Sequence, residues 1–217
     1  MNGVLEMNAW KLILAGGPIM APILLCSLFS LSIVIERLVY FHNITTDVTK
    51  LKQQVFDLIK TNKIKDAVVV CENNPSPVAK IFKAALTKFG SSREDVKEQI
   101  EDVSLYEIPK LEMRLGALST IAQVSPLLGL LGTALGIAAC FYTIQLRASA
   151  LNPITPGDLA GGMGQALITT ITGLVVAIPT SVVYNYFLHR VNYLALEMER
   201  AATEIVNFMF QFSETNA

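Results

Sequence analysis

The chain has 217 residues, of which 52% are hydrophobic and only 16% are charged, and its mean hydropathy is +0.48. A soluble domain usually carries about a quarter of its residues as charged side chains. The 17 basic and 18 acidic residues nearly cancel, for a net charge of −1. These values argue against an ordinary soluble enzyme and against a basic nucleic-acid-binding protein. We expect no catalytic residues, no bound cofactor, no metal and no nucleic-acid partner.

Three segments contain no Asp, Glu, Lys or Arg: residues 12–35, 115–146 and 159–188. A helix needs roughly 20 apolar residues to cross the hydrocarbon core of a bilayer, so each segment is long enough. The sequence therefore predicts an all-α integral membrane protein with three transmembrane helices.

The first segment could also be a cleaved signal peptide. Its preceding stretch pairs Glu6 with Lys11, so the usual positive bias is missing, and the apolar run exceeds the typical length of about 7–15 residues. We expect it to remain as a span. Cys26 and Cys140 fall inside spans and Cys71 stands alone between them, which suggests neither a disulfide framework nor a metal site.

The basic residues predict the orientation in the membrane. Thirteen of the 17 lie between Arg37 and Arg114, and Arg190 and Arg200 are in the tail. The positive-inside rule puts residues 36–114 and 189–217 in the cytoplasm. The N-terminus, residues 1–11, and the loop 147–158 then face outward.

The cytoplasmic parts carry apolar residues at helical spacing, which predicts packed helices. The stripes comprise Val48, Leu51, Val55, Leu58 and Ile59; then Val96, Ile100, Val103 and Leu111; and in the tail Val191, Leu194, Met198, Ala201, Ile205, Phe208 and Phe212. Residues 73–77 and 90–92 break the chain, and Ser91 with Glu94 fits a capping box. Pro109 is expected to bend the helix that leads to the second span.

The second and third spans hold small residues at helical spacing. Gly132 and Gly136 form a small-xxx-small pair, with Gly129 one turn before them. Ala166, Thr170, Gly173 and Ala177 share one face of the third span. Two interpretations stay open. The stripe serves helix packing, with Thr133 and Thr170 bonding carbonyls of their own helices, or it lines a central path where the threonines meet a polar guest.

No span contains an ionisable residue of the four strongest types, whereas proton relays usually need one. If protons move here, a partner must bring the titrating group. His42 and His189 lie at span edges and are read as interfacial. Pro126 and Pro179 lie inside spans, where the hydroxyls of Ser125 and Thr180 are candidates to satisfy the carbonyls that each proline frees.

In order along the chain, these residues resemble the MotA/TolQ/ExbB proton channel family. The resemblance covers nearly the whole chain, and its three spans are similar to the ExbB/TolQ branch rather than to four-span MotA proteins. It rests on Gly16-Gly17-Pro18 with Pro22, Glu36-Arg37-Leu38, the segment 126–133, the segment 166–170, Gly173-Leu174, Ala177-Ile178-Pro179 and Tyr184-Asn185.

The resemblance implies a homopentamer whose second and third spans surround the single-span helices of ExbD/TolR-like subunits. Each such helix would carry an intramembrane Asp, and proton passage would drive a TonB- or TolA-like protein. By motif position, Thr133 and Thr170 correspond to the pore threonines, with Ser125, Thr169 and Gln165 as further candidates for the ion pathway. Glu36 and Arg37 are expected to anchor the membrane boundary or contact a neighbouring subunit.

One residue departs from the family pattern. Many relatives have a Glu five positions before the third-span threonine, where this chain has Gln165. Glutamine forms hydrogen bonds but does not titrate. The departure leaves a proton-relay role at this position in doubt and keeps sodium open as the coupling ion, because hydroxyl and carbonyl oxygens suit hard cations.

Two rival classes remain. A solute transporter would usually need more spans and internal repeats, and neither is present. A non-conducting scaffold for an envelope complex would use the same small residues for packing alone. Membrane lipid is an expected partner in every case.

Overall fold

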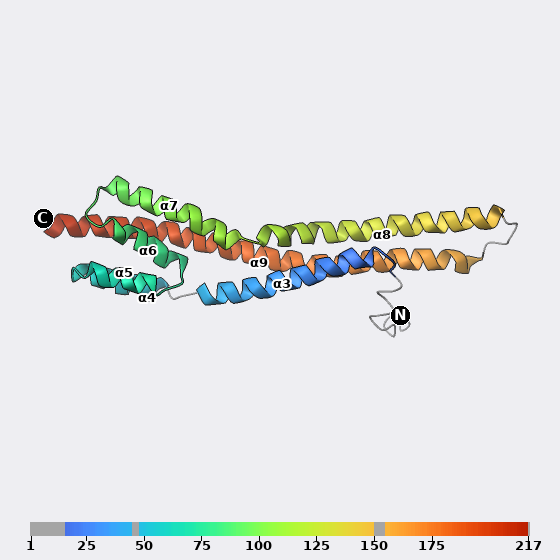
Figure 1. The fold of residues 1–217 in the computed structure, drawn as a ribbon, viewed down its shortest axis with the longest axis horizontal. Helices are drawn as coiled ribbons and strands as arrows, with labels where there is room; N and C mark the ends of the chain where they lie inside the picture. The colour runs from blue at the N-terminus through green and yellow to red at the C-terminus, as the bar shows by residue number, and fades with distance from the viewer. Residues whose placement is uncertain (1–15, 45–47, 150–154, 217) are drawn as a thin grey trace. The chain divides into compact units, whose positions relative to one another are not determined.

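The computed structural model describes residues 16–44, 48–149 and 155–216 of the chain, and in this part the secondary structure is helical (Figure 1). The helices are α3 (Met20–Ile44), α4 (Val48–Lys60), α5 (Ile64–Glu72), α6 (Pro77–Thr87), α7 (Arg93–Glu112), α8 (Leu115–Ser149) and α9 (Pro156–Asn216). The N-terminus predicted to face outward, the start of the first predicted span and residues 150–154 of the 147–158 loop lie outside the described residues. The stretch on which the question of signal cleavage depends lies outside them too.

Three helical stretches each contain a segment long and apolar enough to cross a membrane. These stretches are Met20–Lys60, which includes α3, Arg93–Arg147, which includes most of α8, and Leu159–Phe212, which lies in α9. The prediction of an all-α chain with three membrane helices is confirmed. Large apolar side chains on these helices are exposed, among them Leu28, Phe29, Leu130 and Ile171. Exposed apolar surface of this extent is what a bilayer, and not water, would cover.

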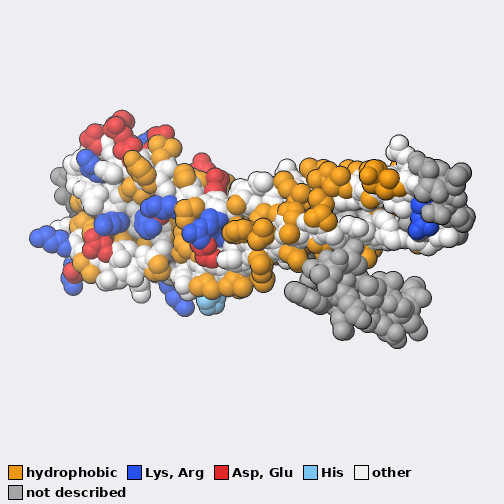
Figure 2. All heavy atoms as spheres, turned by 45° about the vertical axis from the view of Figure 1, so that its right-hand side comes forward, with side chains coloured by type: hydrophobic (Ala, Val, Ile, Leu, Met, Phe, Trp, Pro, Cys, Tyr) orange, Lys and Arg blue, Asp and Glu red, His pale blue; other side chains and the backbone are white. Residues whose placement is uncertain are grey.

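The chain forms two compact units. The first comprises Met1–Val34 with Arg114–Asn185, and the second comprises Ile35–Met113 with Tyr186–Ala217. Helices α3 and α9 contribute residues to both units. The space-filling view shows the charged side chains gathered mostly toward one end of the visible face (Figure 2).

The second unit is a helical bundle in which α4–α7 pack with the C-terminal part of α9. The rings of Phe56 on α4 and Phe208 on α9 stack at 4.3 Å, and Lys52 forms an ion pair with Glu204 at 2.5 Å. Phe82 on α6 is fully buried. The predicted stripes supply this core: Leu51, Val55, Ile59, Val96, Ile100, Leu111, Val191, Leu194, Met198, Ala201 and Ile205 are all buried.

Helix α7 begins one residue later than the sequence pattern suggested. Gly90 adopts a left-handed conformation, with φ of 88°, and the amide of Ser91 donates to the carbonyl of Lys88, which places Ser91 in the turn. The capping box is therefore formed by Ser92 and Asp95, each side chain accepting from the other residue's backbone amide at 3.2 Å. The predicted pair of Ser91 and Glu94 was wrong by one residue.

Pro109 lies inside α7, as expected of a residue in the helix that leads to the second span. The interruption before α8 comes later, at Met113 and Arg114, where Arg114 has φ of 67°. Arg37 closes this helix end: its Nη1 donates to the carbonyl of Lys110 at 3.4 Å, and its guanidinium lies 5.0 Å from the ring of Tyr40. A cation at a helix C-terminus is favourable because the last carbonyls there lack intrahelical partners.

Glu107 lies on α7 one turn before this cap and is a buried charged residue of the second unit. Its side chain is 8% exposed, and its carboxylate accepts from Lys80 of α6 at 2.5 Å and from Lys110 at 2.6 Å. Burial raises the pKa of the Glu107 carboxyl, but the hydrogen bonds from Lys110 and Lys80 outweigh burial and hold the pKa below its ordinary value.

Both span prolines lie within uninterrupted helices, Pro126 in α8 and Pro179 in α9. The neighbouring hydroxyls do not bond the carbonyls that the prolines free, four residues before each. The Oγ of Ser125 donates to the carbonyl of Ile121, and the Oγ1 of Thr180 donates to that of Val176, both at 2.7 Å. Each hydroxyl serves the adjacent carbonyl, since each reaches back four residues from its own position.

Candidate functional site

The two threonines that the sequence singled out face one another in the first unit. Thr133 projects from α8 and Thr170 from α9, and their Oγ1 atoms form a hydrogen bond. Both side chains are half-buried, so each keeps some exposed surface in the single chain. We call Thr133 and Thr170 the threonine pair.

Two backbone carbonyls serve the threonine pair jointly. The carbonyl of Gly129 lies 3.2 Å from Oγ1 of Thr133 and 3.1 Å from Oγ1 of Thr170. The carbonyl of Ala166 lies 3.4 Å and 3.3 Å from the same two atoms. Each threonine can therefore donate to its own helix or to the other helix. The two hydroxyls supply two protons for several acceptors, so the order of donation within the pair can reverse.

Small residues let α8 and α9 approach closely enough for this arrangement. A Cβ on Gly129 would lie 3.0 Å from the Cα of Thr170, and one on Gly132 would overlap the side chain of Thr169. A Cβ on Gly173 would lie 2.6 Å from the carbonyl oxygen of Ser125. Without side chains at these positions, the two backbones come into direct contact.

The same seam extends from the threonine pair toward the α8–α9 loop. Gly136 faces Ala166, whose Cβ would lie 2.8 Å from a Cβ at the glycine, and Gly162 faces the carbonyl of Gly136 and the sulfur of Cys140. Ala166 and Ala177 are buried. The predicted small-residue stripe therefore lies against α8 of the same chain.

Two further candidates for the ion pathway, Thr169 and Ser125, are more deeply buried than the pair. Thr169 is 1% exposed and donates to the carbonyl of Ala166 at 2.8 Å. Ser125 is fully buried and bonds within its own helix. In the single chain both hydroxyls are occupied in α8–α9 packing, while Thr133 and Thr170 remain partly accessible.

Gln165 lies against the start of the first membrane helix. Its side-chain amide occupies the place that a Cβ of Gly17 would take, and Gly17 has a left-handed φ of 72°. The neighbouring Gly16 approaches Ile168 of α9, at 3.5 Å from a built Cβ. Sequence reasoning noted the Gly16-Gly17-Pro18 motif and Gln165 separately but missed this contact, because nothing in their spacing joins them.

Sequence reasoning also missed the charged cluster of Glu107, Lys80 and Lys110. A sequence signal existed for one half, because Glu107 and Lys110 stand at the i, i+3 spacing of helical ion pairs. Lys80 lies on another helix, α6, so no helical spacing in the sequence relates it to Glu107. Of the two boundary residues, Arg37 is 1% exposed and caps α7, and Glu36 is half-buried.

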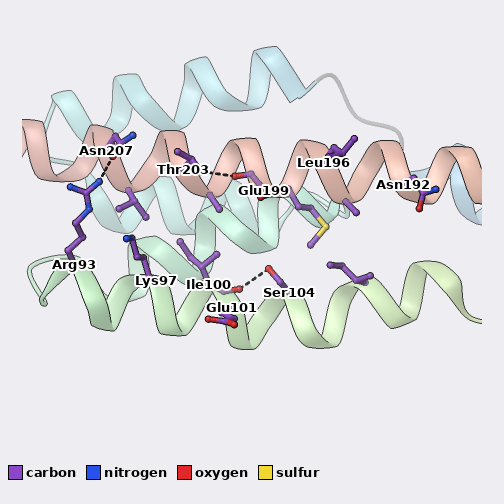
Figure 3. Close-up of a pocket in the computed structure, with 15 residues that line it drawn as sticks. Arg93, Lys97, Ile100, Glu101, Ser104, Asn192, Leu196, Glu199, Thr203 and Asn207 are labelled. Carbon is purple, nitrogen blue, oxygen red and sulfur yellow. Dashed lines mark hydrogen bonds between the residues drawn. The ribbon is translucent and has the colours of Figure 1, made fainter.

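A cavity of about 890 Å³ lies elsewhere, between α7 and the C-terminal part of α9 (Figure 3). Its floor includes Ile100 and Met198, and its charges are of both signs, as in Lys97 and Glu199. At one end Arg93 donates to the Oδ1 of Asn207 at 2.5 Å. The mixed lining gives this groove no selective charge.

Taken together, three helices able to span a membrane and a hydroxyl pair in a seam without Asp, Glu, Lys or Arg define a helical membrane protein. A model of the MotA/TolQ/ExbB proton channel family matches residues 73–200. The chain belongs to this family, and its relatives place it in the ExbB/TolQ-like branch.

Three relatives illustrate the similarity. A putative biopolymer transport protein ExbB-like 3 of Synechocystis sp. is 33% identical over 174 residues, covering 80% of this chain and 82% of the relative. The biopolymer transport protein ExbB of Neisseria meningitidis serogroup A is 24% identical over 217 aligned residues, covering 92% and 96%. The Tol-Pal system protein TolQ of Haemophilus influenzae is 37% identical over 108 residues, covering 49% and 42%.

Proposed function

We propose that this chain is the ExbB/TolQ-like subunit of an ion-driven motor in the bacterial inner membrane. In this proposal it assembles as a pentamer around the single-span helices of ExbD/TolR-like partners. The motor would couple the proton motive force to work in the cell envelope through a TonB- or TolA-like protein. Family membership and the names of the relatives support the motor class.

The observation that carries the proposal is the threonine pair. The spans offer hydroxyls and backbone carbonyls but no carboxylate, so this chain lacks the group that would carry the proton. A partner Asp would supply it. An ionised Asp needs a hydrogen-bond donor and a protonated Asp needs an acceptor, and the threonine pair offers both because its donation order can reverse.

The charge pattern supports an orientation for this motor. We propose that residues 1–11 and 147–158 face outward, that 12–35, 115–146 and 159–188 span the membrane, and that 36–114 and 189–217 lie in the cytoplasm. The buried ion cluster of Glu107 suits an aqueous compartment on that side.

Thr133 and Thr170 are the proposed ion-pathway residues, and Ser125, Thr169 and Gln165 would support them. Gly129, Gly132, Gly136, Ala166, Gly173 and Ala177 would hold α8 against α9, with Glu36 and Arg37 at the boundary. Sodium as the coupling ion is a second candidate, favoured by Gln165 in place of the family Glu and by the oxygens at the pair.

The test replaces each threonine singly with Val, which keeps the branched shape and removes the hydroxyl. Each variant is reconstituted with its ExbD/TolR-like partner, and flux is measured with proton and with sodium gradients. We expect the flux to fall by about tenfold or more, since a lost hydrogen bond to a charged group is worth about 1.5–3 kcal/mol. The matched control is Thr143→Val, at a half-buried position of α8 where the hydroxyl donates to the carbonyl of Ala139 in its own helix.

The same flux measurement distinguishes the ion-driven motor from a non-conducting scaffold. A non-conducting scaffold would use the seam only for packing, and the burial of Gly129 and Gly173 between α8 and α9 favours such a role. Wild-type flux in both threonine variants would refute the assignment of the pair. No flux in the wild-type complex under either gradient would favour the scaffold.

A further inference from the structure

The threonine pair lies between large apolar side chains on both of its helices. Leu130 and Ile137 stand three residues before and four residues after the threonine of α8, and Leu167 and Leu174 stand at the same offsets from the threonine of α9. Residues at these offsets share a helix face. All four side chains are between 43% and 63% exposed in the single chain, whereas the two threonines are half-buried. The face that presents the pair is therefore apolar on both sides of it.

These four side chains form two levels, because α8 and α9 run in opposite directions. The residues that precede Leu130 and Leu174 are glycines in contact, with the Cα of one 3.2 Å from a Cβ built on the other. The residues that precede Ile137 and Leu167 also contact each other, at 2.8 Å between a built Cβ and the Cβ of the alanine. We call Leu130 with Leu174 the first apolar band, and Ile137 with Leu167 the second. Each band lies one helical turn, roughly 5 Å, from the threonine pair.

The bands and the pair differ in what they offer to water and ions. The pair presents hydroxyl and carbonyl oxygens, and the side chains of the bands present hydrocarbon alone. A narrow passage lined by apolar side chains excludes water, which is how hydrophobic constrictions close ion channels. A proton or a sodium ion that enters such a passage loses its hydration without gaining a ligand, at a high cost in free energy. An ion therefore reaches the pair only when another group carries it past a band.

We propose that the two apolar bands seal the ion path at the threonine pair until the partner helix is in place. The inference rests on the proposed function, because the bands line a path only if the pair does. Once the partner is bound, its carboxyl crosses a band in the protonated, uncharged form, which costs far less desolvation than a free ion. The seal keeps a ring that lacks its partner from dissipating the ion gradient.

The experiment measures proton entry into liposomes that hold the full chain without its partner. A pH-sensitive dye inside the liposomes reports the rate, and potassium with valinomycin fixes the membrane potential. Two barriers in series limit the rate jointly, so opening one of two equal barriers raises it by about twofold at most. The design therefore compares Leu130→Ser alone with a double variant that places a hydroxyl in both bands, Leu130→Ser with Ile137→Thr. A second double variant, on α9, is Leu174→Ser with Leu167→Ser.

The matched control is Leu131→Ser with Leu135→Ser. Both leucines are exposed, and they lie on α8 nearly opposite Thr133. A hydroxyl that only loosens the helix would act at these positions too. Native mass spectrometry and circular dichroism report whether each variant assembles and folds as the wild type does.

We expect the wild type and the control to be tight, Leu130→Ser to stay within about twofold of the wild type, and both double variants to leak about tenfold faster or more. Each of four results would overturn the proposal. These are a wild type that leaks as fast as the double variants, folded double variants as tight as the wild type, a control that leaks as they do, and a full leak in Leu130→Ser alone, which leaves no role for the second band. If the α8 double variant does not assemble, the α9 double variant decides the question.

Failure of the seal and failure of the motor give different results. A leaking wild type without its partner, together with normal flux in the complex, refutes the seal and leaves the motor in place. Absence of flux in the wild-type complex refutes the motor, and the double variants without the partner then still show whether the bands close a path.

Discussion

Replacing Gly173 with alanine should destabilise the packing of α8 against α9. The new Cβ would lie 2.6 Å from the carbonyl oxygen of Ser125 and 3.2 Å from the Cα of Gly129. Both neighbours are backbone atoms, which cannot rotate away as the end of a side chain can. Because ordinary van der Waals contact begins at 3.4 Å, the two helices must separate locally by roughly 0.8 Å.

The magnitude follows from two opposing terms. Overpacking a tight contact costs about 1–3 kcal/mol, and alanine gains about 0.5–1 kcal/mol over glycine in a helix. The difference between the two ranges runs from about 0 to 2.5 kcal/mol, so we expect a net loss of about 1 kcal/mol in the free energy of unfolding. Gly164→Ala is the matched control on the same helix, because no atom lies within 4 Å of a Cβ built there.

The assay is reversible unfolding in mixed micelles, with an increasing fraction of a denaturing detergent, followed by circular dichroism. Gly164→Ala should be as stable as the wild type or slightly more stable. Equal stability of Gly173→Ala and Gly164→Ala would refute the argument that backbone contact at this seam determines the packing of the two helices.

Three other predictions concern the second unit. Ser92→Ala should lower the free energy of unfolding by about 0.5–2 kcal/mol, because it removes the N-cap of α7. Glu107→Gln should lower stability at neutral pH and should also remove an acid-dependent loss of stability. The folded-state pKa of Glu107 is held low, so its contribution is complete above the ordinary carboxyl pKa of about 4.3 and is lost as the pH falls through the folded value. Cys71 should resist maleimide at pH 7–8 until the protein is denatured, since burial raises the pKa of its thiol to about 12.

Each of these predictions has a direct check. Thermal unfolding of Ser91→Ala should match the wild type, and a larger loss there than in Ser92→Ala would contradict the observed cap. Unfolding between pH 3 and pH 7 tests Glu107, and an unchanged acid dependence in Glu107→Gln would contradict its role. Rapid labelling of Cys71 in a variant lacking Cys26 and Cys140 would show that the thiol is not buried.

The membrane helices could be predicted from the sequence because a bilayer imposes a length and a charge rule on each span separately. Thr133 and Thr170 could be singled out by helical spacing and by family resemblance. The sequence could not predict that the two threonines share backbone carbonyls, because that prediction requires the distance between α8 and α9. That distance depends on which glycines meet which backbone atoms, as Gly173 meets the carbonyl of Ser125.

Local sequence patterns did not predict the structure where two neighbouring residues fitted the same motif, or where a contact joined two different helices. Ser91 and Ser92 both stand three residues before an acidic residue, and the left-handed turn at Gly90 decides between them. For Arg37 the sequence predicted a place at the boundary or at a subunit contact, and it did not predict the bond to the carbonyl of Lys110, which spans 73 residues of sequence. Contacts between residues this far apart in the chain produce no periodic pattern in the sequence.

The carbonyl of Gly129 accepts from both threonines, and the α-carbon of the same residue contacts Gly173. One position therefore serves both the polar chemistry and the closest approach of the helices. An effort to change ion preference at this seam cannot vary the two independently, since any side chain at Gly129 would move the shared acceptor. Serine at Thr133 or Thr170, which keeps the hydroxyl and removes only a methyl group, is the change that leaves this acceptor in place.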